Sequence, residues 1–127
     1  MKIFVAGGAG FIGSNFIRYI FKKHKNARIL NYDKLTYSGN LDNLKDIIKD
    51  KRYDFVKGDI ADKKRLEKTI KDFQPDYIIN FAAETHVDRS IHVGAKEFIN
   101  TNIIGVFNFL ELAKANPKIK KYLQVST

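Results

Sequence analysis

The chain has 127 residues, no cysteine and a formal net charge of +9. Its length allows one domain with a buried core, and the lack of cysteine excludes both a disulfide framework and a Cys-based zinc site, so we expect no metal. No apolar run approaches the ~20 residues that span a membrane, and we expect no signal peptide before the first apolar run. We therefore expect a cytoplasmic protein with no membrane partner.

Lysine supplies most of the positive charge, and the lysines are scattered, with small clusters only at residues 22–25 and 118–121. Aromatic residues do not alternate with them, as they would in a platform for single-stranded nucleic acid. We interpret the charge as a solvated lysine-rich surface and expect no nucleic-acid partner. A basic nucleic-acid binder is the alternative, which a salt-dependent DNA titration would reveal.

Strand-like apolar runs alternate with helical patterns along the whole chain. Strands are expected at residues 3–6, 28–32, 53–57, 77–81 and 122–126. Helices are expected at residues 11–23, in a short segment over residues 41–48, after an N-cap at Asp62, and from about residue 94 to 115. This alternation predicts an α/β fold: a Rossmann-type, doubly wound parallel sheet of five strands in the order 3-2-1-4-5, with helices on both faces.

Two of the expected helices carry apolar residues whose burial can be predicted. The first helix should bury Phe11, Ile12, Phe16, Ile17 and Ile20. The long helix repeats apolar residues at 4-3-4-3 spacing and has two more beside this stripe: Ile99, Ile103, Val106, Leu110 and Ala113, with Ile104 and Phe107. One face should cover the sheet, and the other needs a later segment or a second subunit unless it is buried within the monomer. We expect a homo-oligomer, such as a dimer, formed through this helix or through the outer edge of the last strand.

A glycine-rich turn over residues 7–13 joins the first strand to the first helix. Gly8, Gly10 and Gly13 fit the pattern G-x-G-x-x-G, and Gly7, Gly10 and Gly13 fit the related spacing G-x-x-G-x-x-G. Glycine lets the backbone turn tightly and approach phosphates without a Cβ, and the following helix presents free N–H groups and the positive end of its dipole. The turn therefore predicts a site for the pyrophosphate of a dinucleotide.

Two acidic residues follow the second and third expected strands. Asp33 lies twenty residues after Gly13, where a carboxylate accepts hydrogen bonds from the adenosine ribose hydroxyls and repels a 2′-phosphate. It therefore favours NAD over NADP, although Lys34 beside it weakens this inference. Asp59 ends the third strand at the same edge of the sheet, where it either meets the adenine amino group or simply terminates the strand.

A polar loop over residues 81–91 follows the fourth strand at the same edge. Ala82 and Ala83 are small enough for the backbone to approach a cofactor, and two carboxylates, a histidine, an arginine and two hydroxyls follow them. The loop lies at the switch point between the first and fourth strands, which favours a ligand site. His86 is a candidate for proton transfer, although a single histidine without a visible partner is more often structural.

Five segments together resemble the dTDP-glucose 4,6-dehydratases of the extended short-chain dehydrogenase/reductase family. The resemblance runs in register along the whole chain, through residues 7–13, 33–41, 57–60, 81–91 and 125–127. The glycine motif is shared across that family. The segments 33–41 and 85–91 are closer to the dehydratases than to the epimerase or decarboxylase branches.

The resemblance implies a role for each of several residues. Phe11 and Ile12 would contact the pyrophosphate through their backbone, beside the glycines of the turn. The adenosine would lie among Asp33, Lys34, Leu35, Thr36, Asp59 and Ile60. The nicotinamide side would be lined by Phe81, Ala82, Ala83, Glu84 and Thr85, with Thr101 from the long helix. Thr85 would also reach the sugar, and Thr127 matches the active-site threonine that hydrogen-bonds the sugar 4-hydroxyl. The implied cofactor is NAD and the implied substrate is the nucleotide sugar dTDP-glucose.

The resemblance also implies a lyase reaction whose catalytic groups are incomplete in these residues. In the family an Asp-Glu pair follows the threonine, a Tyr-x-x-x-Lys pair lies on the next helix, and most sugar-nucleotide contacts lie in a C-terminal region. The matches Tyr19/Lys23 and Tyr53/Lys57 are chance, because the first lies far along the first helix and the second lies on a strand. We therefore expect residues 1–127 to form an NAD-binding Rossmann domain that is inactive alone. The alternatives are the corresponding half of a UDP-sugar epimerase or decarboxylase, or a non-catalytic NAD-binding module.

Overall fold

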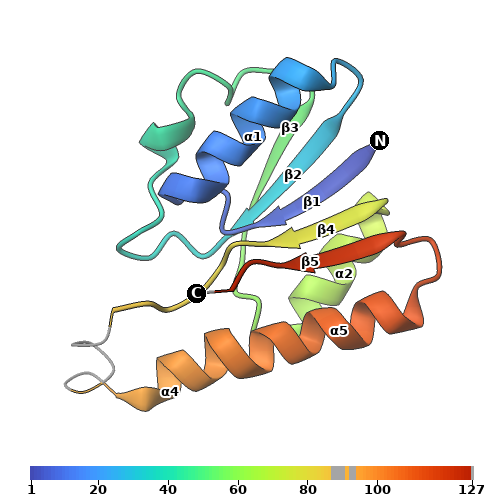
Figure 1. The fold of residues 1–127 in the computed structure, drawn as a ribbon. Helices are drawn as coiled ribbons and strands as arrows, with labels where there is room; N and C mark the ends of the chain where they lie inside the picture. The colour runs from blue at the N-terminus through green and yellow to red at the C-terminus, as the bar shows by residue number, and fades with distance from the viewer. Residues whose placement is uncertain (87–90, 92–93, 127) are drawn as a thin grey trace.

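The computed structural model describes residues 1–86, 91 and 94–126. They form one parallel sheet in the order β3-β2-β1-β4-β5, as the alternation of elements predicts (Figure 1). The strands are β1 (Lys2–Ala6), β2 (Arg28–Asp33), β3 (Tyr53–Lys57), β4 (Tyr77–Asn80) and β5 (Lys121–Gln124). Their ends differ from the expected ones by two residues at most. The sheet reverses its order between β1 and β4, which places the candidate site at the carboxyl ends of these two strands.

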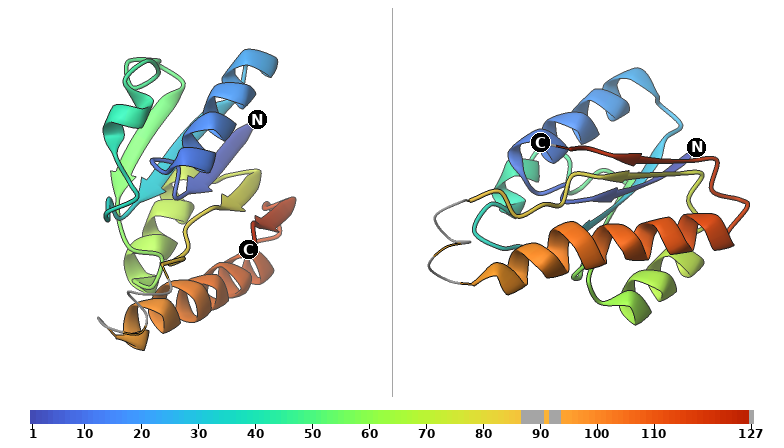
Figure 2. Two further views of the ribbon diagram at one scale, coloured as in Figure 1. Left: turned by 60° about the vertical axis from the view of Figure 1, so that its left-hand side comes forward. Right: turned by 60° about the horizontal axis from the view of Figure 1, so that its bottom comes forward.

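Helices cover both faces of the sheet, as the two views of Figure 2 show. Helix α1 (Phe11–Lys23) and the 3₁₀ helix η1 (Leu41–Leu44) lie on one face. Helix α2 (Lys63–Phe73) and a long helix lie on the other. The long helix consists of α4 (Ala95–Phe98), a π-helical segment η2 (Ile99–Gly105) and α5 (Val106–Ala115). Helix α2 begins as predicted, because the Asp62 side chain accepts a hydrogen bond from the backbone N–H of Arg65 at 3.2 Å.

Alternation along the central strand β1 divides the core into two clusters. Ile3 and Val5 point to the face covered by α1 and η1, whereas Phe4 and Ala6 point to the face covered by α2 and α5. Both faces are apolar because helices cover the parallel sheet on each side and bury both of its faces. Phe109 of α5 is fully buried in the second cluster, with its ring centroid 6.0 Å from that of Phe4.

The expected burial of Phe11 and Ile12 is wrong. Their exposed fractions are 80% and 61%. Both lie in the first turn of α1, beside the glycine turn at the carboxyl edge of the sheet, so no strand lies beneath them. Ile17 and Ile20, farther along the helix, are buried as predicted.

The apolar stripe predicted on the long helix largely faces outward. Ile103 is 60% exposed and Leu110 is 51% exposed. The side toward the sheet is made of Thr101, Gly105, Asn108 and Phe109, all of them buried. Gly105 packs against the Ile60 side chain, which an added Cβ would approach to 2.4 Å. The spacing of large apolar residues therefore did not show which side packs on the sheet, and the alternative of complete burial within the monomer does not hold for this helix.

Candidate functional site

A groove opens at the carboxyl edge of the sheet, above the point where β1 and β4 diverge. Its walls come from the turn after β1, the ends of β2 and β3, the segment after β4 and the long helix. The lining residues are Gly7, Gly10, Tyr32, Asp33, Lys34, Thr36, Ser38, Gly39, Gly58, Ile60, Phe81, Ala82, Ala83, Glu84 and Thr101. Most residues predicted for a cofactor are therefore brought together here. Phe11, Ile12, Gly13, Leu35, Asp59 and Thr85 are not among the lining residues.

The glycine turn is packed so tightly that a Cβ at two of its positions would collide with backbone atoms. Gly7 has a φ of +73°, and a Cβ there would lie 2.6 Å from the backbone nitrogen of Ala82. A Cβ on Gly13 would lie 2.3 Å from the carbonyl oxygen of Gly7. A Cβ on Gly10 would meet only that same oxygen, at 3.4 Å, so this position faces open space beside the groove. Helix α1 begins here without a side-chain cap, which leaves the N–H groups of its first turn available to an anion.

A buried amide holds the glycine turn against β2. The Asn31 side chain is fully buried, and its Oδ1 accepts a hydrogen bond from the backbone N–H of Gly8 at 3.0 Å. Its Nδ2 donates to the Tyr53 hydroxyl, also at 3.0 Å. The sequence analysis missed Asn31, although a polar residue inside an otherwise apolar strand is a signal that could have identified it.

Asp33 is held rigidly at the end of β2. Its carboxylate is buried, with Oδ2 accepting from the backbone N–H of Ala9 at 2.9 Å and Oδ1 accepting from that of Leu35 at 2.8 Å. The same acid therefore ties the glycine turn to the segment after β2. Each carboxylate oxygen can accept a second hydrogen bond, so the group remains able to receive two ribose hydroxyls.

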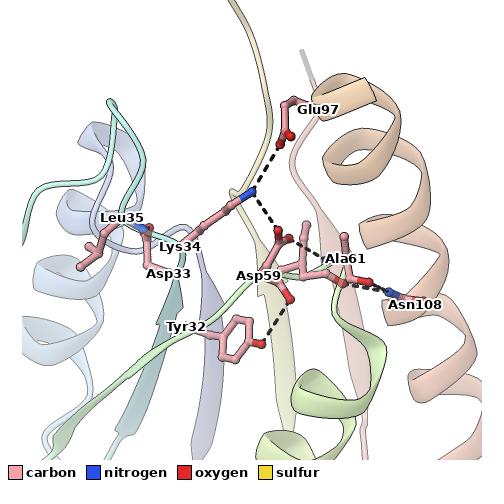
Figure 3. Close-up of polar contacts among 9 residues, drawn as sticks. Tyr32, Asp33, Lys34, Leu35, Asp59, Ala61, Glu97 and Asn108 are labelled. Carbon is pink, nitrogen blue, oxygen red and sulfur yellow. Dashed lines mark hydrogen bonds and ion pairs between the residues drawn. The ribbon is translucent and has the colours of Figure 1, made fainter. Parts of the chain in front are cut away.

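Lys34 joins three elements across one end of the groove (Figure 3). Its Nζ lies 2.8 Å from Asp59 Oδ2 and 3.4 Å from Glu97 Oε2 of α4. The hydrogen bond to Asp59 raises the pKa of the Lys34 ammonium above its ordinary value. The other oxygen of Asp59 accepts from the backbone N–H of Ala61 at 2.9 Å, so both oxygens of this carboxylate have partners within the protein.

Two further side chains position the turn after β3 that carries Asp59 and Ile60. The Tyr32 hydroxyl donates to the Asp59 carbonyl oxygen at 3.3 Å, and Asn108 Nδ2 donates to the Ile60 carbonyl oxygen at 2.9 Å. Burial raises the pKa of Tyr32 to about 12, so its hydroxyl remains protonated at neutral pH. The sequence analysis assigned no role to Tyr32 or Asn108, because neither contact follows from a local pattern.

The segment after β4 is clamped from both sides. The amide of Asn102 in η2 accepts from the backbone N–H of Glu84 and donates to its carbonyl oxygen, both at 2.9 Å. The Tyr37 hydroxyl donates to Glu84 Oε2 at 3.0 Å, and the Tyr37 ring packs edge-on against His86 with centroids 4.8 Å apart. His86 thus has an aromatic neighbour, and Thr85 is exposed at the end of this segment. A π-helical turn such as η2 often occurs at functional sites.

Several residues that the sequence analysis singled out lie outside the groove or outside the described residues. Thr127, predicted to be catalytic, and residues 87–90 and 92–93 of the polar loop and the stretch after it lie outside the described residues. Tyr19 is exposed on α1, whereas Tyr53 is buried and bonded to Asn31, and neither lines the groove. Among residues 1–86, 91 and 94–126, no cluster of His, Asp and Glu side chains could hold a metal ion. The described helices include none that is long and apolar enough to cross a membrane.

The fold and the groove together define a Rossmann-type α/β domain with a groove at its topological switch point. The family model described as GDP-mannose 4,6 dehydratase matches residues 4–127. The chain therefore belongs to this dehydratase family.

Individual relatives agree with the family assignment. A probable dTDP-glucose 4,6-dehydratase of Sinorhizobium fredii is 50% identical over 114 residues, covering 90% of this chain and 32% of that protein. A crystal structure of dTDP-glucose 4,6-dehydratase from Bacillus anthracis in complex with NAD matches with a TM-score of 0.87 and 46% identity, over 100% of this chain and 37% of that one. A UDP-glucose 4-epimerase from Thermotoga maritima matches with a TM-score of 0.85 and 30% identity, over 100% and 38%. The chain spans about a third of the length of the curated dehydratases that it matches.

Proposed function

We propose that this chain binds NAD in the groove at the carboxyl edge of the sheet, and that it is the cofactor-binding portion of a dTDP-glucose 4,6-dehydratase. One observation carries the proposal: the uncapped start of α1 and the rigid Asp33 carboxylate face the same groove, where a dinucleotide needs an anion site and a ribose site. Solved relatives that contain NAD support the choice of cofactor.

Each wall of the groove would contact a different part of the cofactor. The backbone of Gly10, Phe11 and Ile12 would bind the pyrophosphate. Gly10 has no Cβ, so the phosphates can approach the backbone closely there. Asp33 would accept hydrogen bonds from the adenosine ribose, with its orientation already set by the Ala9 and Leu35 N–H groups. The adenine would lie beside Ile60, and the segment over residues 81–85 with Thr101 would flank the nicotinamide.

The comparisons favour a dehydratase over an epimerase. The dTDP-glucose 4,6-dehydratase relatives are 39–50% identical to this chain, against 30% for the Thermotoga maritima epimerase at a similar TM-score. The fold alone does not separate the two branches. In the parent reaction implied by the sequence resemblance, bound NAD⁺ would accept a hydride from sugar carbon 4 and the reduced cofactor would return it to carbon 6, after water has left carbons 5 and 6.

The groove lacks a tyrosine suited to remove the proton of the sugar hydroxyl, among the residues that the structure describes. Tyr32 is the one tyrosine among the lining residues that the structure describes, and its raised pKa of about 12 makes it a poor base. We therefore expect the 127 residues alone to bind the cofactor without converting dTDP-glucose.

Calorimetric titration of the 127-residue protein with NAD⁺, and separately with dTDP-glucose, tests this proposal. We expect a single site for NAD⁺ with weak to moderate affinity and little heat from the sugar nucleotide. Absence of NAD⁺ binding by a folded sample would contradict the assigned cofactor role. Steady release of the 4-keto-6-deoxy sugar on mixing both ligands would contradict the expected lack of turnover.

A further inference from the structure

Asp33 and Lys34 have opposite effects on the predicted cofactor selectivity. A basic residue near the end of β2 is the usual means of accommodating the 2′-phosphate of NADP, and Lys34 stands directly beside Asp33. With a net charge of +9, the molecule as a whole also attracts anions. On sequence alone, Lys34 therefore weakens the preference for NAD that Asp33 indicates.

The structure directs the Lys34 ammonium away from the ribose-binding acid. Figure 3 shows Asp33 turned toward the Leu35 backbone, whereas the Lys34 side chain extends to the opposite side, toward the turn after β3 and the start of α4. Its Nζ lies within 2.8 Å of one carboxylate oxygen, on Asp59, and within 3.4 Å of another, on Glu97. Three segments far apart in sequence supply this arrangement.

The local charge balance is negative despite the basic surface. Asp59 and Glu97 place two carboxylates around the Lys34 ammonium, and Asp33, which pairs with backbone N–H groups instead, adds a third negative charge to one positive charge. A 2′-phosphate carries about −1.5 to −2 at neutral pH, so it would meet net repulsion here unless Lys34 were released. The ribose hydroxyls of NAD carry no such charge and do not need the lysine.

We propose that Glu97 is a specificity-determining residue that, together with Asp59, holds Lys34 neutralised and so keeps the adenosine end of the groove selective for NAD over NADP. Asp33 supplies the ribose contact. Glu97, with Asp59, neutralises the Lys34 charge that would otherwise offset the negative charge of Asp33. This inference rests on the proposed binding of a nicotinamide dinucleotide in the groove. It adds a residue of α4, about sixty positions after Lys34 in the chain, to the determinants of cofactor choice.

Fluorescence anisotropy of NADH and NADPH, titrated with the 127-residue protein at low ionic strength, tests the proposal. The wild type should bind NADH more tightly. Because the pair is exposed, Glu97→Gln should tighten NADPH binding by about two- to five-fold and leave NADH binding unchanged. The double variant Glu97→Gln/Lys34→Gln should lose that gain, because the lysine is then absent.

Glu111→Gln is the matched control, since it makes the same charge change on an exposed residue of α5, about 21 Å farther along the helix at 1.5 Å per residue. It should leave the NADPH-to-NADH ratio at the wild-type value. If the wild type binds NADH and Glu97→Gln does not change the ratio, or if the gain persists without Lys34, this inference is wrong while the proposed function stands. If the wild type binds neither nucleotide, both are wrong.

Discussion

At the scale of single residues, the glycines of the turn have different physical roles. Gly13 and Gly7 are required by packing, because an added Cβ at either would lie less than 3 Å from backbone atoms. Gly10 is required by neither packing nor backbone conformation, since its φ of −76° is accessible to any residue and its Cβ would meet one atom at 3.4 Å. A glycine without a structural requirement, at the lip of the groove, is best explained by close approach of a ligand.

This difference predicts opposite results for two similar substitutions. Gly13→Ala should lower the free energy of unfolding by about 1–3 kcal/mol, because relief of the 2.3 Å contact with the Gly7 oxygen must distort the turn. That loss outweighs the gain in helix propensity of up to about 1 kcal/mol. Gly10→Ala should stay within about 0.5 kcal/mol of the wild type. Urea denaturation measures both, and equal losses in the two variants would contradict the packing argument.

At the scale of elements, strands were easier to predict than the faces of helices. Each strand of a sheet with helices on both faces needs only a short apolar run, and such runs identified all five strands. The prediction of helix α2, including its N-cap, was correct. One face of this helix is charged, so Leu66, Ile70 and Phe73 identify its buried face. The packed face of the long helix was not predicted, because Gly105 and Asn108 face the sheet. Gly105 allows close packing, and Asn108 donates a hydrogen bond to the Ile60 carbonyl oxygen.

The exposed stripe of the long helix predicts self-association. Ile103, Phe107 and Leu110 are at least half exposed and lie at i, i+4 and i+7, which makes a continuous apolar surface. We expect the 127-residue protein to sediment as a dimer or larger species, and Phe107→Glu to shift it toward monomer. Tyr19→Glu is the control, because Tyr19 is 56% exposed on α1, in the opposite layer. A wild type that remains monomeric at high concentration would contradict this expectation.

At the scale of the whole molecule, the site depends on contacts that no local pattern encodes. The residues of the glycine turn, Asp33 and the segment after β4 could be predicted, because each follows a strand at the edge where ligands bind. Glu97, Asn102 and Asn108 could not, because their partners lie on other elements and only the packing of the long helix brings them together. The π-helical segment of that helix also could not be predicted from the spacing of its apolar residues.

The buried tyrosines predict how the whole fold responds to alkaline pH. Burial raises the pKa of Tyr32 to about 12, and it also raises the pKa values of Tyr53 and Tyr122. Since the unfolded value is about 10, the folded state holds these protons more tightly. The stabilisation is complete below pH 10 and should be lost as the pH rises from 10 to 12. Urea midpoints across this range should fall less steeply for Tyr32→Phe than for the wild type, and identical slopes would contradict the assignment.

The central claim is that NAD lies against the glycine turn, and calorimetry of Gly10→Val beside the wild type tests it most directly. Gly10 lines the groove, and a Cβ added there would meet only the Gly7 carbonyl oxygen, at 3.4 Å. We expect the variant to melt within a few degrees of the wild type and to lose at least about ten-fold in NAD⁺ affinity, as steric exclusion of the pyrophosphate from this turn requires. Unchanged NAD⁺ affinity in a folded Gly10→Val protein would contradict the placement of the cofactor.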